Sequence, residues 1–316
     1  MELDWHKSKA HLLLLSKYIS ANSFYDFAQH EYWKSWWNNL LGEPSTQAIK
    51  RFVDEGMLTT PELNELLSYK YKVNELKDML KQKGLPVSGR KEEMIKRLVK
   101  ADPDGILKSV AELSLLKCTQ RGHEIAEQYI KANKEKIAQV EHQVMEYLIK
   151  RKFKEASLAV ATYEAEDGFS SGMGIKRNPE REIEELKTIF ESKPKIIARL
   201  GNEKLEAVRI AAAMTALWGT TTKSSEKWLP ASFETGLFFD SETAVRMFVF
   251  FGRHRAELER YRSEGLKLVE VLSAPDACES CKKLTGKHYK INDVPELPYE
   301  HCTHKMGCRC TFLPVV

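Results

Sequence analysis

The sequence predicts a mainly α-helical protein that ends in a small cysteine-rich module of α/β or ribbon-like type. Three observations support this fold class. Apolar residues recur mostly at spacings of three and four, which is the period of a helix. Only 16 glycines and 11 prolines occur in 316 residues, too few for the many turns of a β-sandwich or β-barrel. Five of the six cysteines lie together between residues 278 and 310.

The composition excludes several classes of protein. Hydrophobic residues make up 42% and charged residues 30% of the chain, so it can bury a core and is not a disordered chain. The net charge of +4 excludes a uniformly basic, histone-like protein. No apolar run reaches the about 18 residues that a membrane helix needs. The start, Met1-Glu2-Leu3-Asp4, lacks a signal peptide, so we expect a cytoplasmic protein, nucleoid-associated if bacterial.

The first region, residues 1–65, is expected to be helical. The apolar pattern predicts helices over 12–18, 24–41 and 47–57, and Thr60 followed by Pro61 indicates a further helix start. Trp33, Trp36 and Trp37 lie together and are interpreted as the face of a helix that packs into the core. A base-stacking platform is the alternative, but Lys34 is the only cation close to them.

The middle of the chain, residues 103–166 and 183–270, is expected to be helical as well. We expect a helix over 106–116, an interruption at Gly122, and one long or two successive amphipathic helices as far as about residue 165. Cys118 is interpreted as a small core residue of this helical region. Residues 167–182, rich in Gly, Ser, Asn and Pro, are predicted to be a linker. Further helices are expected over 180–190, 195–200, 203–218 and 253–265, while 233–251 is ambiguous between helix and strand.

Residues 66–102 form the first segment with a functional pattern. Val73, Leu76 and Leu80 share one helical face, and Gly84 is placed to end that helix in a left-handed conformation. Leu85-Pro86 predicts an extended connection, and Ser88 is a candidate N-cap for a second helix. The apolar face of that second helix consists of Met94, Ile95 and Leu98.

This segment resembles the SAP family, a helix–extended–helix motif that binds DNA. The resemblance covers about residues 69–102 and rests on both apolar stripes together with Gly84-Leu85-Pro86, Ser88-Gly89 and Lys91. It implies a DNA-binding domain. The alternative is an ordinary helical hairpin with a solvated basic face.

The charge pattern supports a partner that carries phosphates. Residues 70–100 contain ten Lys and Arg against four Asp and Glu, so the positive charge of the chain is concentrated here. Arg90 and Lys91 lie at a predicted helix N-terminus, where backbone amides also attract phosphate. The candidate duplex-DNA contacts are Lys72, Lys83, Ser88, Gly89, Arg90, Lys91 and Arg97.

The C-terminal segment, residues 271–316, is expected to bind a metal. Cys278 and Cys281 form a Cys-x2-Cys pair, and three further cysteines with His304 follow some 20 residues later, the spacing of a tetrahedral zinc site. The predicted ligands of a structural Zn²⁺ are Cys278, Cys281, Cys302 and Cys308, with Cys310 and His304 in reserve. A metal-free reduced or disulfide-bonded cluster and a catalytic metal site are the alternatives. This module could also contact other proteins.

The same segment is similar to the C-terminal end of the minor head (head morphogenesis) proteins of tailed phages. The matching residues are Asp276, Cys278, Cys281, Leu284, Gly286, Pro295, Pro298 and Cys308-Arg309-Cys310. Cys302 is extra, and His304 lies one residue further from Cys308 than that pattern has it. The likeness implies a phage or prophage head component as an alternative function.

The leading hypothesis is therefore a non-enzymatic protein that binds duplex DNA through a SAP module and carries a zinc-stabilised tail. A nuclease is the remaining alternative. Glu164, Glu166 and Asp167 form the only tight acidic group outside obvious helix faces, and we interpret them as a solvated helix end.

Overall fold

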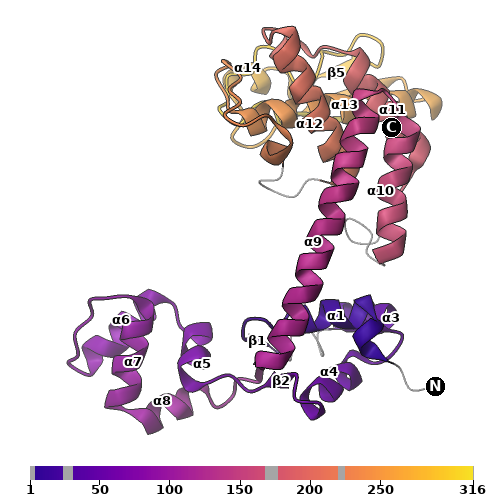
Figure 1. The fold of residues 1–316 in the computed structure, drawn as a ribbon. Coiled ribbons are helices and arrows are strands. Elements are labelled where there is room, and N and C mark those ends of the chain that lie inside the picture. Colours follow the sequence, from indigo (N-terminus) through magenta and orange to yellow (C-terminus); the bar gives the residue numbers. More distant parts are fainter. Residues whose placement is uncertain (1–3, 24–30, 168–176, 220–224, 316) are drawn as a thin grey trace. The chain divides into compact units, whose positions relative to one another are not determined.

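The computed structural model describes residues 4–23, 31–167, 177–219 and 225–315 (Figure 1). The chain divides into two compact units, residues 1–136 and 137–316. The predicted helix over 24–41 lies partly outside the described residues, as does most of the predicted linker over 167–182. Within the described ranges the fold is mainly helical, with a small sheet near the C-terminus, as the sequence predicts.

The first unit opens with a bundle of short helices around a minimal sheet. After the 3₁₀ turn Trp5–Lys7, the helices are α1 (Lys9–Ser16), α3 (Glu31–Leu41) and α4 (Ser45–Asp54). Strand β3 (Leu115–Cys118) pairs antiparallel with β1 (Asn22–Ser23) and with β2 (Leu58–Thr59). Of the three tryptophans, Trp37 lies in the core, whereas Trp33 and Trp36 are 46% and 37% exposed.

The predicted helix over 106–116 is wrong in its second half, because α8 (Pro103–Val110) ends early and the chain then forms β3. The strand brings Cys118 back to α1: its backbone N–H donates to the Tyr18 carbonyl (2.7 Å) and its thiol to that of Leu15 (3.6 Å). Cys118 is buried, as expected of a core residue, but it lies in a strand.

Gly122 does not interrupt the helix. It lies in the first turn of α9 (Gln120–Ile149), and α10 (Phe153–Asp167) follows, so the two-helix alternative for this stretch is correct. A Cβ atom at Gly122 would lie 2.1 Å from the Met57 carbonyl oxygen. Glycine is therefore required by the close approach of two backbones. The boundary between the two units falls within α9.

A second, separate core in the first unit belongs to the SAP-like segment. Helices α6 (Val73–Gln82) and α7 (Lys91–Ala101) contribute Leu76, Leu80, Met94, Ile95 and Leu98. Helix α5 (Leu63–Lys70) adds Leu67, and α8 adds Ile106 and Val110. The two predicted helices thus fold as part of a four-helix body, because two short helices alone bury little apolar surface.

The second unit packs helices around α13 (Ser241–Ser263), which contacts both α11 (Pro179–Glu191) and α12 (Asn202–Trp218). The 3₁₀ turns Lys195–Ile197 and Ser225–Trp228 complete this layer. The ambiguous stretch 233–251 is irregular up to Asp240, whose carboxylate accepts the Thr243 N–H (2.7 Å) and starts α13. The rest of the stretch is helical, because an aspartate at the N-cap favours the start of a helix at this point.

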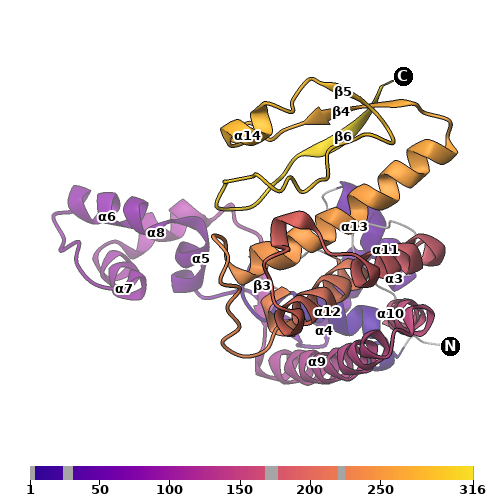
Figure 2. The same cartoon turned by 90° about the horizontal axis from the view of Figure 1, so that it is seen from above.

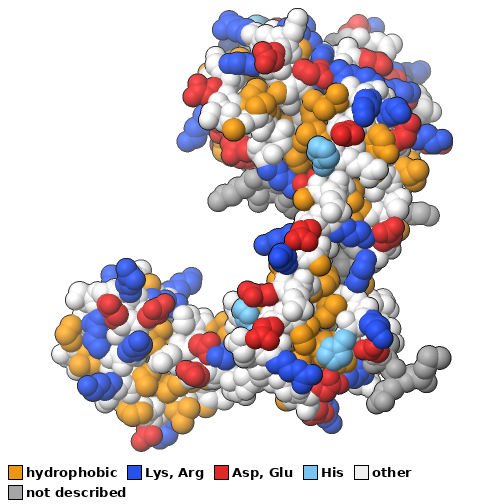
Figure 3. Space-filling model, in the orientation of Figure 1, with side chains coloured by type: hydrophobic (Ala, Val, Ile, Leu, Met, Phe, Trp, Pro, Cys, Tyr) orange, Lys and Arg blue, Asp and Glu red, His pale blue; other side chains and the backbone are white. Residues whose placement is uncertain are grey.

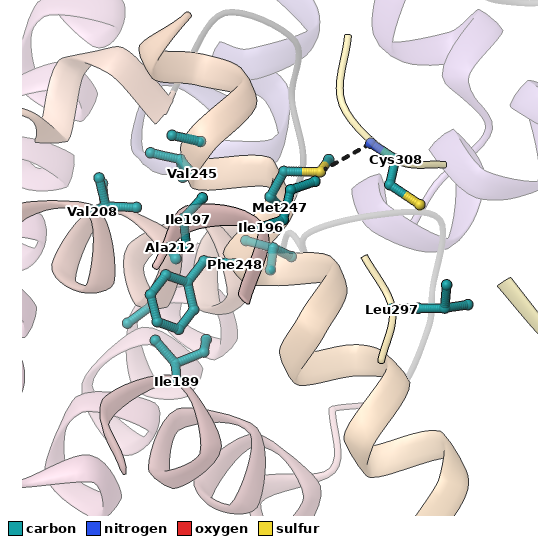
Figure 4. Close-up of a cluster of buried hydrophobic side chains, with 14 of the residues drawn as sticks. Ile189, Ile196, Ile197, Val208, Ala212, Val245, Met247, Phe248, Leu297 and Cys308 are labelled. Carbon is teal, nitrogen blue, oxygen red and sulfur yellow. Dashed lines mark hydrogen bonds between the residues drawn. The ribbon is translucent and has the colours of Figure 1, made fainter. Parts of the chain in front are cut away.

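The C-terminal part forms a three-stranded antiparallel sheet beside α13 (Figure 2). Its order is β5 (His288–Lys290), β4 (Leu268–Leu272) and β6 (Thr311–Val315), and the short α14 (Glu279–Lys282) follows β4. Val269, Val271 and Phe312 face the helices and share one hydrophobic core with them. Figure 4 shows part of this core, where the Cys308 N–H donates to Met247 Sδ of α13 at 3.2 Å.

None of the helices in the described ranges combines the length and the apolar character that crossing a bilayer would need.

Candidate nucleic-acid interface and metal centre

Helix α6 ends as its sequence predicts. Gly84 has φ +63°, the Gly84 N–H donates to the Lys81 carbonyl (3.0 Å), and the Leu85 N–H donates to that of Leu80 (2.9 Å). These two hydrogen bonds define a Schellman C-cap, which turns the chain sharply after the helix. The extended connection to α7 begins directly after it.

Helix α7 begins two residues later than an N-cap at Ser88 would require. Its N-cap is Arg90, whose backbone N–H donates to the Glu93 carboxylate at 3.0 Å. The prediction of Ser88 as N-cap is therefore wrong, because the carboxylate at the third helical position caps the helix instead. The Arg90 side chain is exposed at this helix start.

Arg97 folds back from α7 onto the connection. Its Nη1 and Nη2 groups donate to the carbonyls of Pro86 and Ser88, and its Nε donates to the Glu93 carbonyl at 3.2 Å. Arg97, Ser88 and Gly89 are thus brought together, with Arg90 and Lys91 following directly. The sequence pattern gave no sign of this guanidinium contact, since only the return of the chain reveals it.

The remaining candidate cations differ in their surroundings. Lys72 is exposed at the N-cap of α6. Lys83 pairs with Asp102 at 2.5 Å, and this ammonium group holds the pKa of the Asp102 carboxyl below its usual value. Lys91 donates through Nζ to the Ser68 carbonyl in the last turn of α5 (2.7 Å). Lys and Arg side chains are scattered over the visible face of the α5–α8 body, among acidic and hydrophobic side chains (Figure 3).

The structure brings the five cysteines of the C-terminal segment close together. Two overlapping triads, Cys278–Cys281–Cys302 and Cys281–Cys308–Cys310, each have their sulfur atoms within 4.8 Å of one another. The Sγ atoms of Cys278 and Cys302 lie 3.9 Å apart, and so do those of Cys281 and Cys308. Four ligands at a Zn–S distance of about 2.3 Å stand about 3.8 Å from each other in a tetrahedron. All five cysteines are free thiols.

Backbone groups already favour a thiolate at one position. Burial opposes ionisation of Cys278, but the N–H groups of Thr303 and Cys281 point at its sulfur and lower its pKa to about 6. Burial and the neighbouring Cys308 raise the pKa of Cys281, and the hydrogen bond with Cys308 and burial do so for Cys302. A bound cation would offset this mutual repulsion, because metal ligation requires deprotonated thiols.

His304 lies beside the cluster without joining it. Its Nδ1 accepts the Met306 N–H at 3.2 Å, and its Nε2 lies 3.6 Å from the Asp276 carboxylate. Asp276 also pairs with Arg309 at 2.5 Å. These groups tie the loops around the cysteines together, an arrangement typical of the residues that orient metal ligands. Among the described residues, both groups with metal-binding geometry consist of cysteines alone.

The candidate nuclease carboxylates do not form a site in the described part of the chain. Glu164 is not a solvated helix end: it is buried and pairs with Arg177 at 2.9 Å. Arg177 also pairs with Glu182 and so ties α10 to α11. Glu166 is exposed, and the side chain of Asp167 lies outside the described atoms.

Comparison with known families identifies one domain. Residues 70–103 match the SAP domain family, which agrees with the sequence-based assignment. The comparisons with curated proteins and with solved structures gave no match. The chain therefore carries a SAP domain, a module that suggests a DNA-binding role, within a fold that is otherwise mainly helical. Nothing in these comparisons supports the likeness of the C-terminal segment to phage minor head proteins.

Proposed function

We propose that this protein binds duplex DNA by contacting backbone phosphates with its SAP domain, and that its cysteine cluster holds a structural zinc ion. The observation that carries the first part is the exposed Arg90 at the start of α7, within a segment that concentrates positive charge. Helix N-termini and arginine side chains both favour phosphate. Our proposal is a binding role and not a catalytic one; of the candidate nuclease carboxylates, Glu164 forms an ion pair with Arg177.

Within the SAP domain we assign the phosphate contacts to Lys72, Arg90 and Lys91 and to the backbone around Ser88 and Gly89. Lys91 has two further ammonium protons beyond the one it donates to Ser68. Such contacts are made to the phosphates of the DNA backbone and not to the bases, so affinity should vary little among duplexes of unrelated sequence.

The DNA test replaces Arg90 and Lys91 by alanine together. The double variant should bind several unrelated duplexes more weakly by a similar factor, on the order of tenfold, because two phosphate contacts are lost. The matched control replaces Lys204 and Lys305, two exposed lysines of the second unit, and changes the net charge equally. Equal losses for the two double variants would show that only overall charge matters and would refute the assignment.

The zinc proposal is supported by two Sγ–Sγ distances of 3.9 Å, between Cys278 and Cys302 and between Cys281 and Cys308, which are close to the ligand spacing of a tetrahedral site. The proposed ligands are Cys278, Cys281, Cys302 and Cys308, with Cys310 as the alternative fourth ligand. Zinc bound here would stabilise the C-terminal sheet and the α13 helix, because the four buried cysteines belong to the same core.

Metal analysis tests this proposal. Protein expressed with zinc should contain about one Zn²⁺ per chain, and chelation should promote unfolding of the second unit. Cys302→Ser should remove the zinc, whereas Cys118→Ser, in the first unit, should retain it. Metal-free protein with five titratable thiols in the cluster would contradict the assignment, as would disulfides found by mass spectrometry.

A further inference from the structure

Three features of the structure meet at the connection between α6 and α7. Arg97 donates to the carbonyls of both Pro86 and Ser88, residues on either side of Val87. Its Nε is held in turn by the Glu93 carbonyl of the same helix. The guanidinium group therefore faces protein with donors on both of its terminal nitrogens and on Nε, although the residue as a whole is only half-buried.

Gly89 is packed against the same side chains. A Cβ atom there would lie 2.2 Å from Glu93 Oε2 and 2.9 Å from Arg97 Nη2, and its φ is +108°. Glu93 in turn accepts the Arg90 N–H at 3.0 Å. Arg97 and Glu93 thus fix the path of residues 86–90 from one side, and the glycine allows the backbone to lie directly on them.

We propose that Arg97 is a positioning residue for DNA binding: it clamps the Pro86–Ser88 connection so that Gly89, Arg90 and Lys91 are presented to phosphate, and it does not contact DNA itself. The proposal rests on the proposed function, which it refines by giving Arg97, a contact expected from the sequence, a positioning role instead. Turning toward a phosphate would require Arg97 to give up its hydrogen bonds to two backbone carbonyls of the connection.

Arginine is needed at position 97 for its shape as well as its charge. A planar guanidinium reaches two carbonyls at once in a fixed fork, whereas a lysine ammonium is a single point charge on a flexible stem. Arg97→Lys therefore keeps the charge of the domain while releasing the clamp. At Arg90, by contrast, a lysine can still pair with a phosphate.

The experiment compares Arg97→Lys with Arg90→Lys in the full chain, with duplex affinity measured over a range of salt concentrations. Arg97→Lys should weaken binding about tenfold with an unchanged salt slope, because a disordered connection must be ordered on binding. Arg90→Lys should lose clearly less. Wild-type affinity for Arg97→Lys, or equal losses for both variants, would overturn the positioning role.

Hydrogen exchange of the free protein supplies a readout that does not depend on DNA. In Arg97→Lys, the Arg90 amide, which donates to Glu93, should exchange faster, while the amides within α6 and α7 stay protected and show that the domain is folded. Unchanged exchange of the Arg90 amide would overturn the clamp. If the wild-type chain binds no duplex, the proposed function fails and the positioning role with it; if only the Arg97→Lys results disagree, the proposed function stands.

Discussion

Glu43 is the carboxylate at which α1, α4 and the turn between α3 and α4 meet. It accepts two hydrogen bonds from Arg51, at 2.9 and 2.7 Å, and lies 2.6 Å from Nε2 of the fully buried His11. The other ring nitrogen of His11 lies 2.7 Å from the Ser8 hydroxyl. Because His11 is fully buried, this group of polar side chains is stabilising only while all of its partners are present.

Glu43→Gln should therefore lower the free energy of unfolding of the first unit by about 1–3 kcal/mol at neutral pH. Burial opposes ionisation of Glu43, but Arg51 and His11 hold its pKa below the ordinary value of 4.5. Since the unfolded chain then binds the proton more readily, this stabilisation is present above pH 4.5 and disappears as the pH falls further. Hydrogen exchange of peptides from 9–16 and 45–54 measures it.

The matched control is Glu31→Gln, at an exposed carboxylate in the first turn of α3. Wild type and Glu43→Gln should approach each other in stability as the pH falls below 4.5, whereas the control should follow wild type throughout. A Glu43→Gln protein that remains as stable as wild type at pH 7 would contradict the role assigned to this ion pair.

At the scale of elements, the ends of the SAP helices set their arrangement. Asp102 illustrates this: its carboxylate accepts the Gly105 N–H at 2.9 Å as the N-cap of α8 and also pairs with Lys83 at the end of α6. One side chain thus starts one helix and fixes it to another. Neighbouring helices need such ties because each is too short to be stable alone.

Asp102→Ala should destabilise α8 by about 1 kcal/mol, the usual cost of a lost N-cap. Asp102→Asn keeps a capping oxygen and loses only the exposed ion pair, so it should cost clearly less. Hydrogen exchange over residues 103–110 distinguishes the two. Equal protection in both variants and in wild type would show that the cap contributes nothing measurable.

At the scale of the whole molecule, the described residues of the first unit form two separate cores, and those of the second unit form one that includes four of the cysteines. The apolar periodicity predicts most helices and the SAP segment, because local spacing alone determines which face is buried. The cysteine spacing predicts their clustering for a similar reason, since a Cys-x2-Cys turn places two thiols together.

Other features depend on contacts between distant residues and could not be predicted. Strand β3 forms because Leu115–Cys118 meets β1 and β2, which are far away in sequence. Gly122 was misinterpreted as an interruption because only the approach of Met57 shows why glycine stands there. The clamp by Arg97 and the ion pair of Glu164 with Arg177 likewise require the folded chain.

The central claim is that the SAP domain binds backbone phosphate, and its most direct measurement is the salt dependence of duplex binding by the full chain. We predict that log K falls linearly with log salt concentration and that the double variant Arg90→Ala, Lys91→Ala reduces the slope by about 1.8, about 0.9 for each lost phosphate contact. A double variant with the slope of the wild-type chain would contradict the claim.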